Sequence, residues 1–397
     1  MVLKLDMIQT IALAVVVLLV GQGLKKKIGF LEKYCIPVPV VGGLIFAILA
    51  LVLRQTGVLT FEMDDTLKNV FMTAFFTTVG FTASFKVLKK GGIKVFIFLV
   101  IATVLVILQN VLGVSLAKVF GLNPLIGLAT GSVPMTGGHG TSGAFAPLFE
   151  EAGAIGASTV AMASATFGLI MGSMIGGPIA KKLIEKHSLT NQIKNAGKSM
   201  SVNNQEEAKK LIPENFMSAT VQIILAMGIG TIISAILQKT GMTFPSYIGA
   251  MFAAAIMRNI SDMTDFVNVR MEEIDIIGNT CLSIFLSMAL MTLKLWELAD
   301  LAGPLVIMLL AQTVLMAIFA YFITFNVMGR DYEAAVITSG HCGFGMGATP
   351  NAIANMETMA EKYGPAPVAF FILPLVGSLF IDFFNAAVIT TFMNFFI

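Results

Sequence analysis

Charged side chains are scarce in this chain. Aspartate, glutamate, lysine and arginine make up 12% of its 397 residues, whereas hydrophobic residues reach 56%. Soluble domains carry about 25% charged residues. Long stretches of the chain must therefore lack charged residues, and such stretches face lipid rather than water. The composition therefore excludes an ordinary soluble domain and indicates a protein that crosses a membrane many times.

Cysteine and histidine are also rare, with three of each. Cys35, Cys281 and Cys342 are scattered and show none of the paired spacings of a zinc site or a disulfide framework. Neither His139 nor His341 has another ligand type at metal-binding spacing. We therefore expect free thiols and no metal or organic cofactor that serves catalysis. The acid pair of an intramembrane protease is missing too, so we expect no enzyme.

The net charge of +2 is almost neutral, and the basic residues stand in short clusters between apolar runs. This pattern indicates a lipid bilayer rather than nucleic acid as the partner of the chain. A helix needs roughly 20 residues to cross a hydrocarbon core of about 30 Å. Ten apolar segments approach that length, which predicts an all-α polytopic membrane protein. They are residues 7–23, 37–53, 67–85, 95–118, 155–180, 217–238, 244–257, 276–295, 303–326 and 365–396.

Two further stretches, about 122–149 and 332–356, are apolar but rich in glycine, proline, serine and threonine. Irregular backbone at membrane depth is tolerated only where protein or a water-filled cavity satisfies its peptide groups. Both stretches are therefore interpreted as re-entrant hairpins. The hydrophilic residues 181–212 form a cytoplasmic loop between two halves, residues 1–180 and 213–397, each with five spans and one hairpin.

The positions of lysine and arginine set the expected orientation, because cytoplasmic loops retain positive charge. With both termini outside, 19 of the 25 basic residues fall in loops on the inside. Five spans per half is an odd number, so the second half begins on the opposite side from the first. We therefore expect inverted repeats, in which the first hairpin enters from outside and the second from inside.

Sequence similarity between the halves supports this interpretation. Pro39 and Gly43 recur as Pro245 and Gly249, both offset by 206 positions. Glycine clusters also recur in the two hairpins. Broken, glycine-rich segments at the same place in inverted repeats indicate a transporter binding site near the bilayer midplane. The alternative is that the glycines only allow helices to pack closely.

The residues of the clusters suit a carboxylate ligand. Glycine lets backbone amides approach closely, and two helix N-termini that meet at such a turn would add positive dipole ends. Hydroxyl and amide groups would supply further hydrogen bonds. The predicted substrate-binding residues are Thr136, Gly137, Gly138, His139, Gly140, Thr141, Ser142, Gly345, Gly347, Thr349, Asn351 and Asp382. For His139, satisfaction by backbone carbonyls is an equal alternative.

Asp382 is an acid midway along the last predicted span, where a charge costs about 3 kcal/mol or more. It is expected to bind sodium or a substrate ammonium group, with Ser378 and Asn385 on roughly the same helix face. A protonated or capped Asp382 with a structural role is the alternative. The matching position in the fifth span is Ser173. The predicted sodium-binding residues are Ser173, Gly343, Ser378, Asp382 and Asn385.

Residues 136–147, 339–355 and 373–386, together with the layout of five plus five spans, resemble the bacterial sodium/glutamate symporter family across almost the whole chain. The resemblance implies sodium-coupled import of L-glutamate across the cytoplasmic (inner) membrane, with sodium as the coupling ion. It also implies a homodimer and an elevator-type secondary transporter. A sodium-coupled carrier of another di- or tricarboxylate is the alternative, and a channel is a further one.

The resemblance leaves one group of the substrate without an expected partner. Related carriers of 2-hydroxycarboxylates use a basic residue late in the final span, whereas the last span here contains neither lysine nor arginine. The second carboxylate of glutamate must therefore be bound differently.

Overall fold

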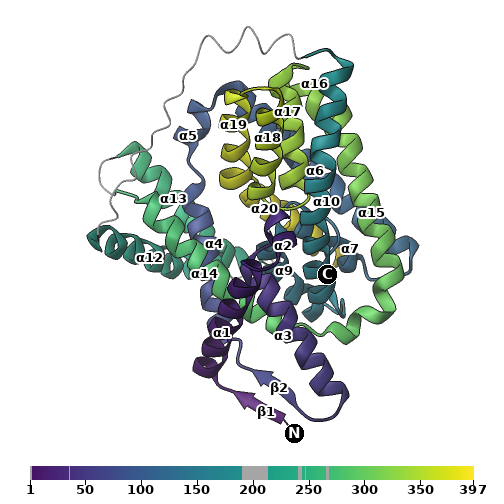
Figure 1. Cartoon of the computed structure of the whole chain (residues 1–397). Coiled ribbons are helices and arrows are strands. Elements are labelled where there is room, and N and C mark those ends of the chain that lie inside the picture. Colours follow the sequence, from purple (N-terminus) through teal and green to yellow (C-terminus); the bar gives the residue numbers. More distant parts are fainter. Residues whose placement is uncertain (1, 35, 190–212, 240–243, 246, 265–267) are drawn as a thin grey trace.

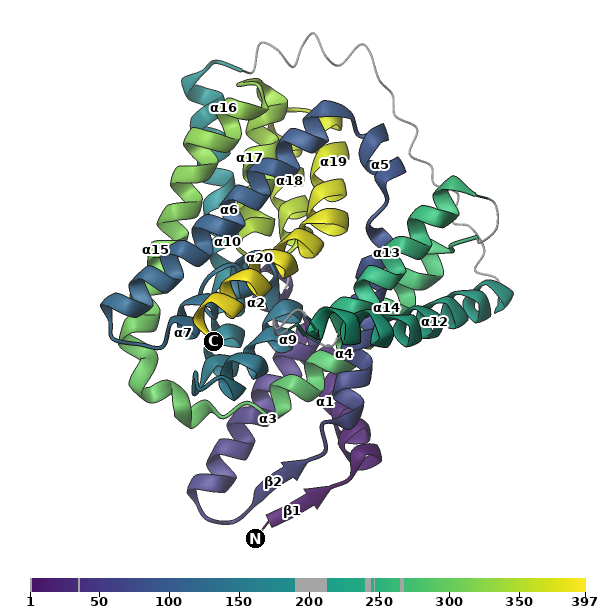
Figure 2. The same cartoon turned by 180° about the vertical axis from the view of Figure 1, so that it is seen from behind.

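The computed structural model describes all residues except 1, 35, 190–212, 240–243, 246 and 265–267. Helices dominate the described chain (Figures 1 and 2), which confirms the all-α membrane class. Most of the predicted loop 181–212 lies outside the described residues. Among those described, seven helices are long and apolar enough to cross a membrane: α1 (Met7–Lys25), α3 (Val38–Gln55), α6 (Gly92–Val119), α10 (Ala157–Lys186), α12 (Pro213–Gln238), α14 (Met271–Met291) and α15 to α16 (Ala302–Met328).

Three of the ten predicted spans differ from these seven. The segments predicted at 67–85 and 244–257 form α4 (Thr66–Thr82) and α13 (Tyr247–Met263), with 17 residues each. The last segment is not one continuous helix. It consists of α19 (Pro367–Pro374), a π-helical turn η3 (Leu375–Phe380) and α20 (Ile381–Phe396), and its two parts are bent by 41°. The break coincides with the π-helical turn η3, which directly follows Pro374, and such turns are a common cause of helix kinks.

Both glycine-rich stretches form broken helical segments. The first contains α7 (Pro124–Leu128), α8 (Ser132–Met135) and α9 (Gly138–Glu151). The second contains α17 (Tyr332–Gly345) and α18 (Thr349–Tyr363). α17 and α18 pack closely, since a Cβ atom on Gly343 would overlap the backbone of Ala352.

The remaining elements are short. They are α2 (Gly29–Lys33), α5 (Phe85–Lys90), the 3-10 helix η1 (Leu295–Leu301), the π-helical turn η2 (Ala320–Thr324) and α16 (Phe325–Met328). Two strands, β1 (Val2–Leu5) and β2 (Thr60–Met63), form a parallel pair in which Val2 faces Thr60. The sequence analysis predicted no strand. Residues 58 positions apart make this pairing, and no local pattern encodes it.

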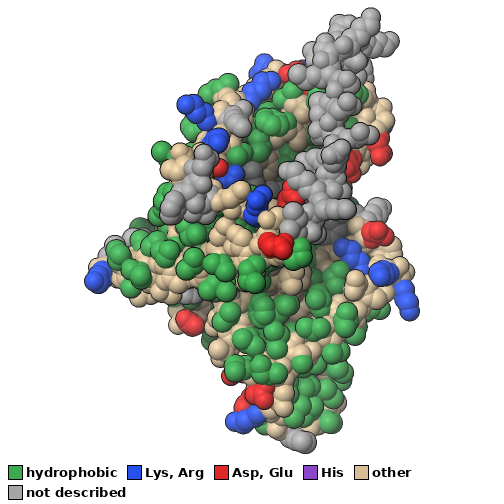
Figure 3. Space-filling model, turned by 90° about the vertical axis from the view of Figure 1, so that its left-hand side faces the viewer, with side chains coloured by type: hydrophobic (Ala, Val, Ile, Leu, Met, Phe, Trp, Pro, Cys, Tyr) green, Lys and Arg blue, Asp and Glu red, His purple; other side chains and the backbone are tan. Residues whose placement is uncertain are grey.

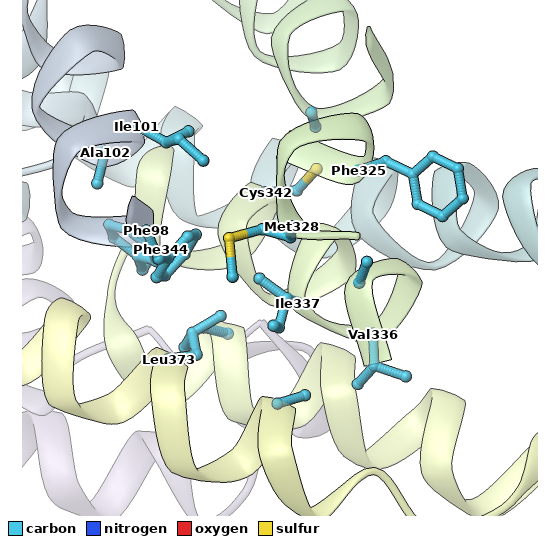
Figure 4. Packing of buried hydrophobic residues seen from close by; sticks show 14 of the residues in the cluster. Phe98, Ile101, Ala102, Phe325, Met328, Val336, Ile337, Cys342, Phe344 and Leu373 are labelled. Atoms are coloured by element: carbon cyan, nitrogen blue, oxygen red, sulfur yellow. The ribbon is translucent and has the colours of Figure 1, made fainter. Parts of the chain in front are cut away.

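The helices fall into two groups. The first group, α6 to α10 and α15 to α20, lies together in Figures 1 and 2. The second group consists of α4 and α12 to α14, which lie to one side of the first, and of α1 and α3 near the N-terminus. The first group has a dense apolar core that includes Phe98, Phe344 and Leu373 (Figure 4). A second buried cluster joins α9 and α20 to α3, α4, α13 and α14. The two groups are therefore in direct contact.

A polar cluster ties the end of α4 to α13. The Ser84 hydroxyl donates to the Asp262 carboxylate, to which Arg258 Nε also donates at 3.2 Å. Asn259 accepts from the Phe85 N–H at 2.9 Å and donates to the Ala83 carbonyl at 2.7 Å. These bonds hold the start of α5 against α13, where the chain leaves one helix group for the other.

Glycine contacts bring α12 and α13 together. A Cβ atom on Gly230 would overlap the backbone of Ala250, and one on Gly249 would overlap the carbonyl of Gly230. A Cβ atom on Gly228, in the same helix as Gly230, would meet no other atom within 4 Å. The two glycines of α12 thus provide a matched test of this packing.

We expect Gly230→Ala to lower thermal stability, because overpacking of a well-packed site costs about 1–3 kcal/mol. Gly228→Ala should be neutral or stabilising by up to about 1 kcal/mol, since alanine is the better helix former. Thermal unfolding of the purified variants in detergent measures both. Equal midpoints for the two variants would contradict the close packing of α12 on α13.

Candidate functional site

A cavity of about 450 Å³ lies between the two helix groups. Its walls come from the glycine-rich ends of the two broken segments and from α3, α4 and α14. Gly377 in η3 and Asp382 in α20 complete the lining. Hydrophobic side chains cover much of the molecular surface (Figure 3), and lysine and arginine lie mainly at the margins of that area. The cavity lining combines apolar side chains such as Phe75 and Leu286 with polar ones such as Asn279 and Asp382.

Nine of the predicted binding residues line this cavity. They are Thr136, Gly137, Gly138, His139, Gly140, Thr141, Gly347, Thr349 and Asp382. The residues come from segments more than 200 positions apart in the sequence. The structure thus brings the two glycine clusters together around one space.

Two helix N-termini reach the cavity without a side-chain cap. α9 begins after Gly137 and α18 after Ala348, and neither residue has a capping hydrogen bond. Some other helices are capped: Asp6 accepts from two N–H groups of α1, and Asp331 accepts from Ala334 N–H at 2.7 Å. The first N–H groups of an uncapped helix lack intrahelical partners and carry positive partial charge. The cavity can therefore hold an anion at either end.

Gly138 adopts a backbone conformation that favours glycine, with φ of +62°. A Cβ atom at this position would also lie 3.0 Å from the carbonyl oxygen of Gly347 in the other cluster. Gly140 faces the opposite wall, since a Cβ atom added there would lie 3.3 Å from the Phe75 ring and 3.4 Å from Leu282. Both glycines thus keep space open, one between the two segments and one across the cavity.

The polar side chains at the cavity have defined partners. Thr136 donates to Gln109 Oε1 at 2.8 Å, and Thr349 donates to the Gly377 carbonyl at 2.9 Å. His139 Nε2 lies 3.0 Å from the Thr166 hydroxyl. His139 therefore has a side-chain partner rather than the backbone carbonyl considered from the sequence.

Asp382 is the one charged residue among the described residues that line the cavity. It lies in the first turn of α20, just after the break, and is half-buried. No described residue forms a hydrogen bond or an ion pair with its carboxylate. The cavity therefore combines one carboxyl group with two positive helix ends, and offers partners to a ligand that carries both signs.

The other predicted binding residues lie outside the cavity lining. Ser142 donates to the Gly138 carbonyl at 2.7 Å, and Asn351 donates to the Leu169 carbonyl at 2.9 Å. The Gly345 carbonyl accepts from Gln109 at 2.7 Å, while Gly343 contacts α18. These residues support the two glycine clusters from behind.

The predicted sodium-binding residues are also dispersed. Ser173 donates to the Leu169 carbonyl of its own helix at 3.1 Å. Asn385 donates to the Ser132 carbonyl at 3.2 Å, and its buried Oδ1 has no partner among the described residues. The side chain of Ser378 lies outside the described part of the chain. Of the described side chains in this set, Asp382 alone lines the cavity, whereas Asn385, Ser173 and Gly343 do not.

Several lining residues were not predicted. Asn279 and Ser283 in α14 and residues 37–39 at the start of α3 face the cavity. Asn279 and Ser283 are one helical turn apart in an apolar span, a polar stripe that could have indicated the site. Pro37, the N-cap residue of α3, and Pro39, in its first turn, gave no such signal.

Comparisons with known proteins agree with this architecture. The family described as Sodium/glutamate symporter matches residues 3–365. The Sodium/glutamate symporter of Escherichia coli (strain K12) is 40% identical over 391 residues, covering 98% of each chain. That of Haemophilus influenzae is 41% identical over 389 residues, covering 96% of this chain and 95% of its own. The chain therefore belongs to the sodium/glutamate symporter family.

Proposed function

We propose that this chain carries L-glutamate into the cell together with sodium ions, and that glutamate binds in the cavity between the two helix groups. The observation that carries this proposal is the convergence of two uncapped helix N-termini on a cavity with a single charged residue, Asp382, among its described lining residues. Membership of a family of symporters supports transport rather than catalysis.

Each carboxylate of glutamate has a partner in this arrangement. The N–H groups at the start of α9 bind one, and those at the start of α18 bind the other, because helix N-termini favour anions. No lysine or arginine is among the described lining residues. Backbone dipoles thus replace the basic residue that related carriers use for the second carboxylate.

Cations balance the negative charges of the glutamate carboxylates and of Asp382. The ammonium group of glutamate or a sodium ion binds the Asp382 carboxylate, which no other described residue pairs with. The unpaired Oδ1 of Asn385 supplies a further oxygen ligand three residues away. Broken helices in transporters commonly coordinate sodium in this way, through exposed oxygens.

Two inverted repeats and an elevator movement fit the order of the elements. α1, α3, α4, α6, the first broken segment and α10 correspond to α12, α13, α14, α15 to α16, the second broken segment and α19 to α20. α6 to α10 and α15 to α20 form the moving body, and α1, α3, α4 and α12 to α14 form a fixed scaffold that also makes the homodimer. The cavity between these bodies is the surface along which they slide.

The distribution of basic residues supports an orientation with both termini outside the cytoplasmic membrane. In this orientation the first broken segment enters from outside and the second from inside. The polar cluster of Ser84, Asp262 and Asn259 then lies on the cytoplasmic side, where it anchors the connection from scaffold to moving body.

Uptake of labelled glutamate into proteoliposomes tests the transport activity. We expect saturable uptake that requires an inward sodium gradient and that unlabelled glutamate inhibits more strongly than citrate. Stronger inhibition by citrate would favour the alternative of a tricarboxylate carrier. Uptake that does not saturate would favour a channel.

Gly140→Val tests the central cavity. The added branch should close the space toward Phe75 and Leu282, and we expect uptake to fall at least about tenfold, the effect of about 1.4 kcal/mol. Gly23→Val is the matched control, because a Cβ atom on Gly23 would meet nothing within 4 Å. Normal glutamate affinity in Gly140→Val would remove the first glycine cluster from the binding site.

The variant Asp382→Asn tests whether the Asp382 carboxylate binds a sodium ion or the ammonium group of glutamate. Loss of a sodium site should raise the sodium concentration for half-maximal uptake, whereas loss of the ammonium partner should weaken glutamate far more than glutarate. The expected change is about tenfold or more, because a hydrogen bond to a charged group contributes about 1.5–3 kcal/mol. Asp6→Asn is the control, since asparagine also caps helices well. Unchanged dependence on both ligands would assign Asp382 a structural role.

A further inference from the structure

A second, smaller cavity of about 230 Å³ lies near the strand pair β1–β2. It is formed by the start of α4, the end of α14, the C-terminal half of α9 and the start of α10. Its lining contains two lysines, Lys68 and Lys294, and two acids, Asp65 and Glu150. We call it the outer cavity, because it lies on the outside in the proposed orientation.

The same two helices line both cavities. Residues 138–141 of α9 and Asn279 to Leu286 of α14 face the central cavity. Gly143, Pro147 and Glu150 of α9, Ala289 of α14 and the residues just after α14, Thr292 and Leu293, face the outer one. The outer cavity is thus the continuation of the central cavity along one helix interface.

A thin apolar layer separates the two spaces. A Cβ atom on Gly143 would lie 2.8 Å from the ring of Phe285 and 3.0 Å from Met162. Phe285 is completely buried. The contact of Phe285 and Met162 with Gly143 therefore lies between the residues that line the two cavities.

The charged groups of the outer cavity already make weak pairs. Lys68 lies 2.9 Å from Asp65, and its side chain is only 12% exposed. Lys294 lies 3.6 Å from Glu297, and Glu150 accepts from the Ser158 N–H at 2.9 Å. The Lys294–Glu297 pair, in which Lys294 is largely exposed, contributes little to stability, so a ligand carboxylate can replace Glu297 there.

We propose that the outer cavity is a first binding site for an amino acid with two carboxylates. Lys68 and Lys294 bind the carboxylates, and Asp65 or Glu150 binds the ammonium group. This proposal rests on the proposed function, since it names the same substrate class. On the route from the outside, it places a site with lysine side chains before the central cavity. The described lining of the central cavity contains no lysine or arginine.

The test measures occupancy of the outer cavity directly. Thr292→Cys places a thiol in its lining, and a membrane-impermeant thiol reagent is added on the side of the N-terminus. Mass spectrometry measures labelling at position 292 alone. The background variant Gly140→Val closes the central cavity, so any protection by glutamate comes from the outer one.

We expect glutamate to slow this labelling in the Gly140→Val background. Lys68→Gln should raise the glutamate concentration for half-protection about tenfold, as loss of one charge-assisted hydrogen bond predicts, and Lys68→Arg should largely restore it. Lys118→Gln is the matched control, because Lys118 lies over the Phe396 ring and away from the cavity.

Two results would overturn the outer site: no protection by glutamate, or protection that Lys68→Gln leaves unchanged. Wild-type protein is assayed for glutamate uptake in parallel. Normal wild-type uptake without protection refutes the outer site alone, whereas absence of sodium-dependent wild-type uptake refutes the proposed function.

Discussion

A peptide N–H group without a partner is costly inside a membrane, and the architecture depends on this constraint. An apolar solvent offers no hydrogen bond, so interrupted helices survive only where protein or a water-accessible cavity surrounds the break. Here the breaks before α9 and before α18 meet at one cavity, and neither N-terminus is capped. The N–H groups that would destabilise an ordinary helix bundle are therefore available to bind an anion.

Hydrogen bonds from the neighbouring helices α6 and α15 hold these breaks in place. Gln109 in α6 connects the two clusters, since it accepts from Thr136 and donates to the Gly345 carbonyl. Gln312 in α15 donates in turn to the Gln109 carbonyl at 2.8 Å. This buried polar chain fixes both glycine segments relative to one another.

The sequence predicted the fold well where the signal was local. Long apolar runs identified most spans, and the glycine-rich stretches identified both broken segments. The break in the last span was missed, because Pro374 lies in a strongly apolar context that is typical of one continuous helix. The pairing of β1 with β2 was missed because it joins distant residues that have no pattern of their own.

The site was predicted only in part, for a physical reason. Residue type shows that a side chain can bind a ligand but not where it points. Ser142 and Asn351 have the right chemistry, yet both donate to backbone carbonyls. Asn279 and Ser283 belong to a helix outside the repeated glycine motif, and only the packing of α14 brings them to the cavity.

The isolated charge of Asp382 also bears on the half of the cycle in which nothing is carried. Under the elevator proposal, the empty moving body carries this carboxylate back from the inside to the outside. Because the cell interior is electrically negative, the membrane potential drives a negative charge in that direction, by up to about 2.3 kcal/mol per 100 mV. Glutamate adds one further negative charge, so the loaded body is neutral if Asp382 is ionised and two sodium ions accompany glutamate. In that case the membrane potential acts on the return of the empty carrier, and the sodium gradient drives the loaded step.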